Sequence, residues 1–466
     1  MSEVPRSDNL PIEYWSVDQI KDDPRSPRRH SRAQISKVQK SIACFGVVVP
    51  LLARPDGTLI NGHAVIAAAR LAGMREVPVV VCRGLKEPSI RALSFALNRT
   101  AEDAGWDKEA LRLAFVEIEA GGLDLSITGF DAAEIDMTIE AQAEPVQTDD
   151  VDLVFSANRD HPAITRPGEL IRLGRHRLLC GNALESAAYP TLLGERMADL
   201  VLTDPPYNVA IQGHVGGRGR IRHAEFAMAS GEMDAAEFTA FLAQFLNAAL
   251  LTVRDGAVLF VFMDHRHQLE MMGAIRQTKL TYLNTCVWTK PSPGQGSFYR
   301  SAHEFCYVLR KGDTAHLNNV QLGKFGRSRT NVWSARGMAG FGAGRDELLR
   351  AHPTDKPIGL IEDAIRDASR RGEIVLDPFC GSGTTILACE NTARIGRGVE
   401  LDPHYCDVII RRWQGLTRDD AIFEATGETF TERLNQAVTA SQGADPRDTD
   451  PQDVDPQDVD PAMSDT

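Results

Sequence analysis

The sequence lacks several features that would assign it to a common class of protein. None of its apolar runs reaches the ~18–20 residues that a membrane span needs, and its start has no basic-then-apolar leader pattern. Its eight cysteines include no CxxC pair, so their spacing indicates neither a disulfide framework nor a zinc knuckle, and we expect no metal site. With 466 residues, 43% of them hydrophobic, the chain is long enough for more than one globular domain. We therefore expect a cytoplasmic, multi-domain protein with no membrane partner.

The formal net charge of −13 is concentrated at one end of the chain. Eight Asp and one Arg lie between Ala444 and Thr466, and together they carry more than half of this charge. The rest of the chain is only mildly acidic for its size, and binding depends on local patches rather than on the total. The acidity therefore does not exclude a nucleic-acid partner.

Composition divides the chain into two folded parts, a linker and a tail. The sequence Pro-Gln-Asp-Val-Asp occurs twice in succession from Pro451, and such a polar repeat buries too little apolar surface to fold, so we expect 436–466 to be disordered. A polar, acidic run predicts a linker over 138–160. Before it, residues 1–137 contain a small α+β unit with trailing helices. After it, strands alternate with helices over 161–435, which predicts an α/β domain with both faces of its sheet covered.

A glycine-rich turn lies between a predicted strand and the helix that follows it. Gly381 and Gly383 permit a tight turn, and the helix N-terminus offers free N–H groups to an anionic or polar ligand. Glu400 follows the next predicted strand, 19 positions after Gly381, where an acidic residue can hold ribose hydroxyls. Ile386 stands where a dinucleotide site has Gly or Ala, and the Gly-Lys-Ser/Thr of a phosphate-binding loop is absent. The pattern favours a nucleoside site without a pyrophosphate, with a purely structural turn as the alternative.

A second cluster, Asp204-Pro205-Pro206-Tyr207, ends the buried strand predicted at 200–202. The two prolines fix the backbone and cannot donate hydrogen bonds, so the Asp204 carboxylate and the Pro205 carbonyl remain as paired acceptors. Two acceptors suit an exocyclic –NH2 group, which has two donors, and Tyr207 offers a flat face for stacking on a base. The alternative is a turn that only ends the strand.

Together these motifs resemble those of the amino-directed DNA methyltransferases that use S-adenosylmethionine. The glycine-rich turn is similar to the family's cofactor turn, and Asp204–Tyr207 to its catalytic tetrapeptide. His352–Pro357 is similar to a third motif, which packs beside the methionine end of the cofactor. The tetrapeptide precedes the cofactor turn, and this is the permuted order of the family's β group. The resemblance implies a Rossmann-like S-adenosylmethionine methyltransferase sheet in permuted order.

The resemblance also implies roles for particular residues. Asp204, Pro205, Pro206 and Tyr207 are the implied catalytic residues. The implied cofactor-binding residues are Asn182, Lys356, Asp377, Phe379, Gly381, Gly383, Thr384, Glu400 and Asp402. Carbon-5 cytosine methyltransferases instead use a cysteine nucleophile, usually after proline, and the sequence contains no Pro-Cys dipeptide.

Basic residues in two glycine-rich stretches suit contacts to DNA phosphates and bases. One stretch follows the tetrapeptide, and the other lies within 290–350, the candidate target-recognition region. Solvated surface loops are the alternative for each residue taken singly. The candidate DNA-binding residues are Arg218, Arg220, Arg222, Lys324, Arg327, Arg329 and Arg336.

Residues 15–100 resemble the ParB/sulfiredoxin-like domain, in the stretch from Asn61 to Arg70 and in the basic residues around Arg28. In that family a turn of this kind binds nucleotide phosphates. Val65 stands where the phosphate-contacting Arg is expected, and this argues against nucleotide turnover. We therefore expect this domain to bind DNA or a partner and to be dispensable for the chemistry; the alternative is a helix packed by small residues.

The prediction is an enzyme that methylates the exocyclic amine of adenine in double-stranded DNA, because Asp-Pro-Pro-Tyr is the commoner adenine form in the family. The same reaction on cytosine is the nearest alternative, since both bases present an –NH2 group. A ParB-like DNA-binding regulator with an inactive methyltransferase fold is the alternative of another class, and intact Asp204, Gly381, Gly383 and Glu400 argue against it. The resemblance suggests a restriction-modification setting, although no partner nuclease is visible in the chain, and the sequence leaves a homodimer open.

Overall fold

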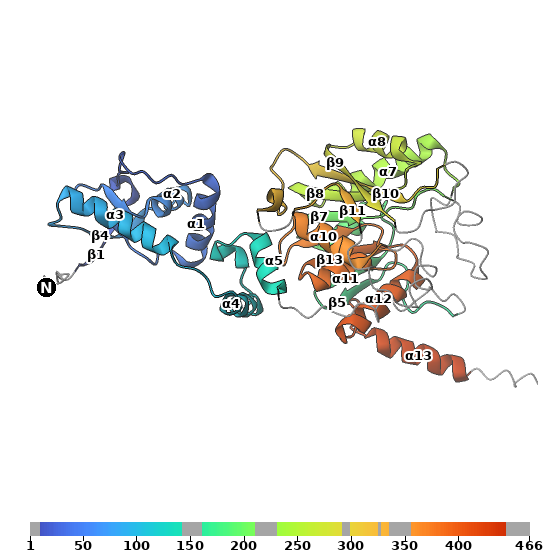
Figure 1. Cartoon of the computed structure of the whole chain (residues 1–466). Coiled ribbons are helices and arrows are strands. Elements are labelled where there is room, and N and C mark those ends of the chain that lie inside the picture. The colour runs from blue at the N-terminus through green and yellow to red at the C-terminus, as the bar shows by residue number, and fades with distance from the viewer. Residues whose placement is uncertain are drawn as a thin grey trace, which may run out of the picture.

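The computed structural model describes residues 10–141, 161–209, 231–290, 299–324, 328–334 and 356–443. Within these ranges the chain forms a four-stranded sheet in its N-terminal part and a ten-stranded sheet in its C-terminal part (Figure 1). This arrangement confirms the predicted fold class, a small α+β unit followed by an α/β domain. No helix in the described ranges is long and apolar enough to cross a membrane.

The N-terminal part folds around a sheet with the strand order β1-β4-β2-β3. Its core includes Val77 and Val79 of the central strand and Ile66 and Ala69 of a helix packed on the sheet, all fully buried. The elements are β1 (Ile12–Ser16), η1 (Val17–Gln19), α1 (Arg32–Phe45), β2 (Leu51–Ala53), β3 (Leu59–Asn61), α2 (His63–Leu71), β4 (Glu76–Val81) and α3 (Glu87–Glu102).

A second, small helical core follows α3. It is built by Phe115, Leu125 and Ile135, and the ring of Phe130 meets that of Phe115 edge to face at 5.1 Å between centroids. The elements are α4 (Lys108–Ala120), η2 (Leu125–Thr128) and α5 (Ala132–Glu140). The linker predicted over 138–160 therefore starts inside α5, because the acidic residues there lie on a helix; residues 142–160 lie outside the described ranges.

The large sheet has the strand order β11-β9-β10-β8-β7-β12-β13-β6-β5-β14. Parallel pairing runs from β8 through β7, β12 and β13 to β6, whereas β10 is antiparallel to both of its neighbours. The strands are β5 (Leu170–Leu173), β6 (His176–Cys180), β7 (Ala198–Thr203), β8 (Val253–Met263), β9 (Leu280–Thr289), β10 (His303–Lys311), β11 (Val332–Ser334), β12 (Ile374–Asp377), β13 (Ile395–Glu400) and β14 (Ile422–Phe423). As the permuted order predicts, β7 precedes β12 in the chain and lies beside it in the sheet.

Helices cover both faces of this sheet (Figure 1). Alternate residues of one strand therefore enter different cores, as Val375 and Leu376 of β12 do. One core includes α6 (Ala188–Leu193), α7 (Ala235–Leu250) and α8 (Gln268–Arg276). The other includes α10 (Ile358–Ala368), α11 (Thr384–Asn391) and α12 (Pro403–Thr417).

A last helix, α13 (Phe430–Gly443), follows β14. The disordered tail predicted from 436 is therefore wrong in its first residues, which continue the helix that Phe430 begins. Residues 444–466 lie outside the described ranges.

Two edges of the large sheet matter for the site. The parallel strands β7, β12 and β13 end at Thr203, Asp377 and Glu400, and we call this side the carboxyl edge. The same strands begin at the opposite side, which we call the amino edge. In open α/β sheets ligands bind outside the carboxyl ends of the strands, so the carboxyl edge is where a site is expected.

Candidate active site

Asp377 joins the tetrapeptide strand to the strand that carries the glycine-rich turn. Its Oδ1 accepts hydrogen bonds from Thr203 Oγ1 at 2.8 Å and from the Phe379 backbone N–H at 3.1 Å, and its Oδ2 accepts one from Thr385 Oγ1 at 2.6 Å. Burial raises the pKa of Asp377 to about 7. In this geometry the Asp377 carboxyl holds the turn in place, and its oxygens are occupied by the protein.

The glycine-rich turn depends on two residues in left-handed conformations. Gly381 has φ 53° and Gly383 has φ 87°. A Cβ at Gly383 would lie 2.9 Å from the side chain of Ile409, so α12 packs directly on the turn. Arg412 of the same helix donates from Nη1 to the Ser382 carbonyl at 2.7 Å and to its hydroxyl at 2.9 Å. Sequence reasoning missed Arg412, since nothing in the sequence links it to a turn 30 residues away.

Glu400 lies beside this turn. Its Oε2 accepts a hydrogen bond from the Gly381 N–H at 2.8 Å, and its Oε1 accepts one from the Asp402 N–H at 2.9 Å. Burial raises the pKa of Glu400 to about 7. The structure therefore brings together the glycine-rich turn and the acid that the sequence picked out.

The remaining predicted cofactor residues lie around the same edge. Asn182 follows β6, and its Oδ1 accepts a hydrogen bond from the Leu184 N–H at 3.0 Å. Asp402 caps α12 by accepting from the His404 N–H at 2.9 Å. Thr384 is the first residue of α11. The ring of Phe379 packs on α7, with its centroid 5.0 Å from that of Phe245.

Asp204 and Tyr207 belong to a network of charged side chains. The Tyr207 hydroxyl donates to Asp204 Oδ1 at 2.5 Å, and its oxygen lies 3.2 Å from Glu304 Oε2. Lys356 forms an ion pair with Asp204 and lies 3.3 Å from Glu304 Oε2. Lys290 pairs with the other oxygen of Glu304. Two lysines and two carboxylates therefore alternate from Asp204 inward.

The network sets the charge states of its members. Burial raises the pKa of Asp204, and the ammonium group of Lys356 opposes this shift. Burial also disfavours ionised Glu304, but the ammonium groups of Lys356 and Lys290 lower the pKa of its carboxyl. The side chain of Lys356 is 5% exposed and that of Glu304 is 9% exposed, whereas that of Asp204 is 35% exposed. Asp204 is thus the accessible end of the network.

Sequence reasoning found Lys356 but missed Glu304 and Lys290. One signal was available, since Glu304 directly precedes the apolar run from Phe305 to Leu309 in strand β10. Nothing in a single sequence pairs it with Lys356, which is 52 positions away. The ammonium group of Lys356 also lies 4.5 Å from the ring centroid of Phe262 in β8, so three strands and the segment before α10 meet here.

Asn208 closes the segment that follows the tetrapeptide. It has φ 52°, its Nδ2 donates to the Met233 carbonyl at 2.7 Å, and its Oδ1 accepts from the Gly231 N–H at 3.0 Å. Asn208 therefore holds Gly231 and Met233 beside the tetrapeptide. The predicted DNA-binding residues Arg218, Arg220, Arg222, Arg327 and Arg336 lie outside the described ranges.

Two predicted DNA-binding residues have their charges compensated within the chain. Arg329 pairs with Asp363 and, at 2.9 Å, with Asp367 of α10, and its side chain is only 17% exposed. Lys324 pairs with Asp131 at 3.3 Å. A DNA phosphate would have to displace the two carboxylates of α10 from Arg329, and DNA contacts of Arg329 and Lys324 stay predictions.

The N-terminal motif is built into its own domain. Gly62 has φ 103° and is the N-cap of α2, which fits its predicted place in a turn. Val65 packs against the core of the small sheet. Arg70 donates from Nη2 to the carbonyls of Val17 and Ile20, at 3.3 and 2.7 Å. The contacts of Val65 and Arg70 support packing rather than nucleotide turnover at this helix.

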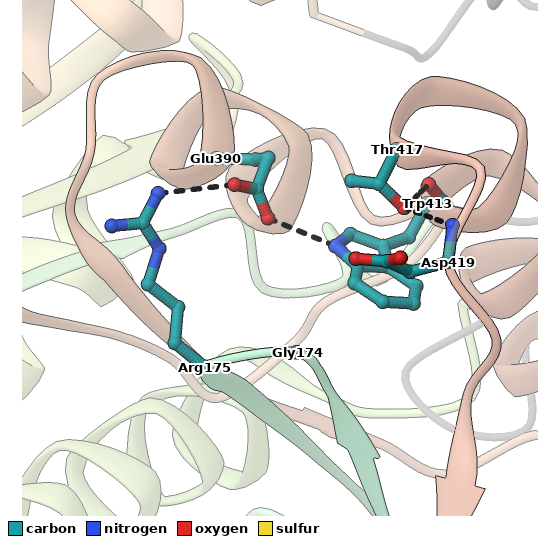
Figure 2. Close-up of a pocket in the computed structure, with 6 residues that line it drawn as sticks. All are labelled: Gly174, Arg175, Glu390, Trp413, Thr417 and Asp419. Carbon is teal, nitrogen blue, oxygen red and sulfur yellow. Dashed lines mark hydrogen bonds and ion pairs between the residues drawn. The ribbon is translucent and has the colours of Figure 1, made fainter. Parts of the chain in front are cut away.

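One pocket lies on the amino edge of the large sheet (Figure 2). One of its two acids, Glu390, already pairs with Arg175 at 3.0 Å and accepts from the Trp413 indole N–H at 3.0 Å. The pocket is lined by Gly174, Arg175, Glu390, Trp413, Thr417 and Asp419. Because it lies at the opposite side of the sheet from Asp204 and Gly381, we assign it no part in the chemistry. The described ranges also contain no group of three or more His, Cys, Asp or Glu residues that could hold a metal ion.

Comparison with known proteins matches two parts of the chain to protein families. Residues 198–411 match the N6_N4_Mtase family, described as DNA methylase. Residues 109–167 match the HTH_ParB_Mtase family, described as ParB-methyltransferase HTH domain.

Individual proteins match parts of the chain. The Type II methyltransferase M.HpaI of Haemophilus parainfluenzae is 24% identical over 250 residues, which are 51% of this chain and 73% of that protein. The structure of TTHA0409 from Thermus thermophilus, a putative DNA modification methylase complexed with S-adenosyl-L-methionine, covers 55% of this chain and 96% of that chain, with 20% identity and a TM-score of 0.36. The C-terminally truncated chromosome-partitioning protein ParB from Caulobacter crescentus, complexed with CTP-gamma-S, covers 30% of this chain and 83% of that chain, with 20% identity and a TM-score of 0.26.

The matched range 198–411 contains the tetrapeptide, the glycine-rich turn and Glu400, which are the residues gathered at the carboxyl edge. The chain therefore carries a DNA methylase domain of the N6/N4 type, preceded by a ParB-methyltransferase helix-turn-helix segment.

Proposed function

We propose that this protein transfers a methyl group from S-adenosylmethionine to the exocyclic amine of adenine in double-stranded DNA. Methylation of an exocyclic amine in DNA follows from the N6/N4 methylase domain. Adenine is the finer proposal, and it rests on the Asp-Pro-Pro-Tyr form of the tetrapeptide. Cytosine remains the alternative, because the same pair of acceptors fits either –NH2 group.

The observation that carries the proposal is the adjacency of Asp204 and the glycine-rich turn at one edge of the sheet. Thr203, directly before Asp204, hydrogen-bonds to Asp377, directly before the turn. A nucleoside held by the turn and Glu400 would therefore lie next to a base held by Asp204. Placing two reactants side by side in an aligned geometry supplies a large part of the rate of a group transfer.

The residues around the turn fit S-adenosylmethionine. A Cβ built at Gly381 would meet no heavy atom within 4 Å, so the turn is open on that side. Glu400 accepts from backbone N–H groups with both oxygens, and each carboxylate oxygen has a second lone pair for a ribose hydroxyl. Once bound, the cofactor supplies a methyl group already activated by its sulfonium charge.

Asp204 is suited to hold the target amine. Tyr207 uses one lone pair of Oδ1 and Lys356 uses one of Oδ2, which leaves one lone pair on each oxygen. With the Pro205 carbonyl, Asp204 would accept the two N–H bonds of a base flipped out of the duplex. The amine nitrogen must lose a proton when it gains a methyl group, and the Asp204 carboxylate can accept it, because burial has already raised its pKa.

Lys356 and Glu304 act on the reaction through Asp204. The ammonium group of Lys356 fixes the Asp204 carboxylate, and Glu304 with Lys290 fixes Lys356. We assign Lys356 and Glu304 as positioning residues for the accessible carboxylate. The DNA would approach the carboxyl edge, where Asn208 follows the tetrapeptide and hydrogen-bonds to Gly231 and Met233.

The test is single-turnover methyl transfer to duplex DNA, with the product bases identified by mass spectrometry. We expect 6-methyladenine from the wild-type protein and loss of transfer in Asp204→Ala. Finding 4-methylcytosine would select the cytosine alternative. Cofactor binding without any methylated base on a broad set of duplexes would instead favour the inactive, DNA-binding regulator.

A further inference from the structure

The segment matched as a helix-turn-helix contains α4 and α5 within the described ranges. In a DNA-binding helix-turn-helix, the second helix lies in the major groove and its side chains reach base edges. For α5 to do this, it must be exposed, and its charge must tolerate the phosphates on both sides of the groove. Neither condition holds for α5.

The charge of the segment is opposite to that of a DNA reader. Helix α5, from Ala132 to Glu140, contains Glu134, Asp136 and Glu140 and no Lys or Arg. Over 107–141 the sequence contains nine acidic and two basic residues. Phosphates would repel this segment at the distances that groove binding requires.

Helix α5 is also covered. Ala133, Ile135 and Asp136 are 1%, 4% and 1% exposed. Met137, at 42%, is its single exposed residue. In the fold α5 packs against α10 of the methylase part (Figure 1). Its faces are therefore used by the α4–α5 core and by the methylase.

Asp136 is covered by an arginine whose N–H groups all have hydrogen-bond acceptors. Arg394, directly before β13, donates from Nη1 to Asp136 Oδ1 at 3.0 Å and from Nη2 to Oδ2 at 2.8 Å. Its other three N–H groups go to Thr392 O, Ser369 O and Ser369 Oγ. All five donors of the guanidinium are used, and Arg394 is 0% exposed.

Two more arginines of the methylase part pair with acids of the same segment. Arg371 forms two hydrogen bonds with Glu119 of α4, at 2.8 and 2.9 Å. Arg366 of α10 donates to Glu140 at 2.8 Å. Bidentate arginine–carboxylate pairs fix orientation as well as position.

We propose that α4 and α5 form an acidic docking unit that binds three arginines, Arg366, Arg371 and Arg394, beside the amino edge of the methylase sheet, and that α5 does not read DNA. The unit then fixes the N-terminal part at the side of the sheet opposite Asp204. The carboxyl edge stays free for the duplex, and the arginines stay covered while the protein is bound to DNA.

The first test compares two charge-neutralising variants of the full chain. Asp136→Asn removes the partner of Arg394, whereas Glu134→Gln makes the equivalent change on the same helix at a residue that has no ion pair within the described ranges. We expect Asp136→Asn to lower the melting temperature by about 5–10 °C. It should also speed amide exchange in 132–141 and 392–397 by roughly tenfold. Glu134→Gln should change neither, and equal behaviour of the two variants would overturn the docking role.

The second test uses the wild-type chain, so it does not depend on a variant that folds. Amide exchange is measured with and without sheared, unmethylated genomic DNA, at a salt concentration where a gel shift shows the protein fully bound. We expect DNA to slow exchange in peptides around 203–209 and to leave 132–141 and 392–397 unchanged. A DNA-induced change in the exchange of α5, in either direction, would overturn the claim that α5 does not read DNA.

Discussion

The two edges of the large sheet contain buried ion pairs of similar chemistry and different accessibility. At the amino edge, Arg394 and Asp136 are almost completely buried, and every donor of the guanidinium has a partner. At the carboxyl edge, the side chain of Lys356 is also buried, with 5% exposed, but its partner Asp204 keeps 35% of its side chain exposed. A closed pair can only hold the structure together, whereas a pair with one exposed member can exchange contacts with a substrate.

The two edges also differ in the number of carboxylates that surround each buried cation. Lys356 lies between two carboxylates, and the Tyr207 hydroxyl is within hydrogen-bond distance of both of them. Removing one member leaves others that can compensate in part. Arg394 has Asp136 at 2.8 Å as its anionic partner, and no second carboxylate of the described ranges pairs with it. We therefore expect that breaking the Arg394–Asp136 pair lowers the stability of the fold at the amino edge. Removing a member of the network around Lys356 should instead slow methyl transfer at the carboxyl edge.

The largest expected effect is on stability at the amino edge. A chain that begins near residue 153 lacks Glu119, Asp136 and Glu140, so Arg394 loses its counterion together with the helix that packs on it. Breaking a buried pair in this way costs about 3–5 kcal/mol. Urea unfolding of this chain, compared with one that begins near residue 104 and keeps α4 and α5, measures the difference.

The same two chains test whether the docking unit matters for chemistry. At a temperature where both are folded, we expect equal rates of methyl transfer per folded molecule, since the amino edge is remote from Asp204. Equal stability of the two chains would contradict the structural role of the pair. If the chain that begins near residue 153 keeps its stability but loses its rate of methyl transfer, α4 and α5 belong to the catalytic site.

The next largest effect is on rate at the carboxyl edge. Asp204→Ala removes a preorganised acceptor and should slow methyl transfer about a hundred- to a thousandfold. Asp199 lies at the other end of the same strand, where it pairs with Arg254 at 2.7 Å. Asp199→Asn is therefore the matched control, and it should lower the melting temperature while leaving single-turnover transfer near the wild-type rate. A rate of methyl transfer by Asp204→Ala close to that of the wild type would contradict the proposed mechanism for either base.

Sequence reasoning predicted the carboxyl edge well because its residues are neighbours of strand ends. A short apolar run such as Leu200–Leu202 marks a buried strand, and polar residues directly after it must lie at that strand's end. Asp204, Gly381 and Glu400 could be found in this way. Their contacts with one another follow from the order of the strands.

The amino edge could not be predicted in the same way. Asp136 and Arg394 are 258 positions apart, and neither lies in a motif. The linker was predicted to begin at 138, although Ile135 and Ile139 have helical spacing and Glu140 lies on the same helix as Asp136. The ion pairs of Arg329 could not be predicted either, because a glycine-rich sequence context does not reveal the acids of α10 with which it pairs.

A smaller effect is expected at the cofactor turn. Glu400→Gln weakens a buried acceptor for the ribose and should reduce the affinity for S-adenosylmethionine by about 1–3 kcal/mol. Titration calorimetry in the presence of a chelator measures this loss, and Glu134→Gln serves as the control for a lost charge elsewhere. Undiminished affinity would remove Glu400 from the cofactor site.

Glu400 also gives the cofactor-free protein a pH dependence of known sign. Burial raises its pKa from 4.5 to about 7, so the folded state binds the proton more tightly than the unfolded state. Its contribution to stability is complete below pH 4.5 and is lost as the pH rises through about 7. Glu400→Gln should flatten this part of the profile in urea unfolding, with the remaining slope coming from Asp377, whose pKa burial also raises to about 7. An unchanged profile would show that Glu400 ionises in the folded protein as it does in the unfolded chain.

The smallest effect tests how far the carboxyl edge tolerates loss of one member. Tyr207→Phe removes the hydroxyl that donates to Asp204 at 2.5 Å but keeps the ring. Lys356 still holds Asp204 in this variant. We therefore expect the activation free energy of methyl transfer to rise by about 0.5–1.5 kcal/mol, which lowers the rate by less than about fifteenfold. Tyr207→Ala also removes the stacking face and should weaken capture of the flipped base by a further 1–3 kcal/mol or so. Single-turnover rates measured against DNA concentration separate the two effects, since the ring should act on the half-saturating concentration and the hydroxyl on the maximal rate. If Tyr207→Phe lowers the maximal rate as much as Asp204→Ala does, the hydroxyl takes part in the chemistry. The carboxyl edge would then tolerate the loss of one member no better than the closed pair at the amino edge does.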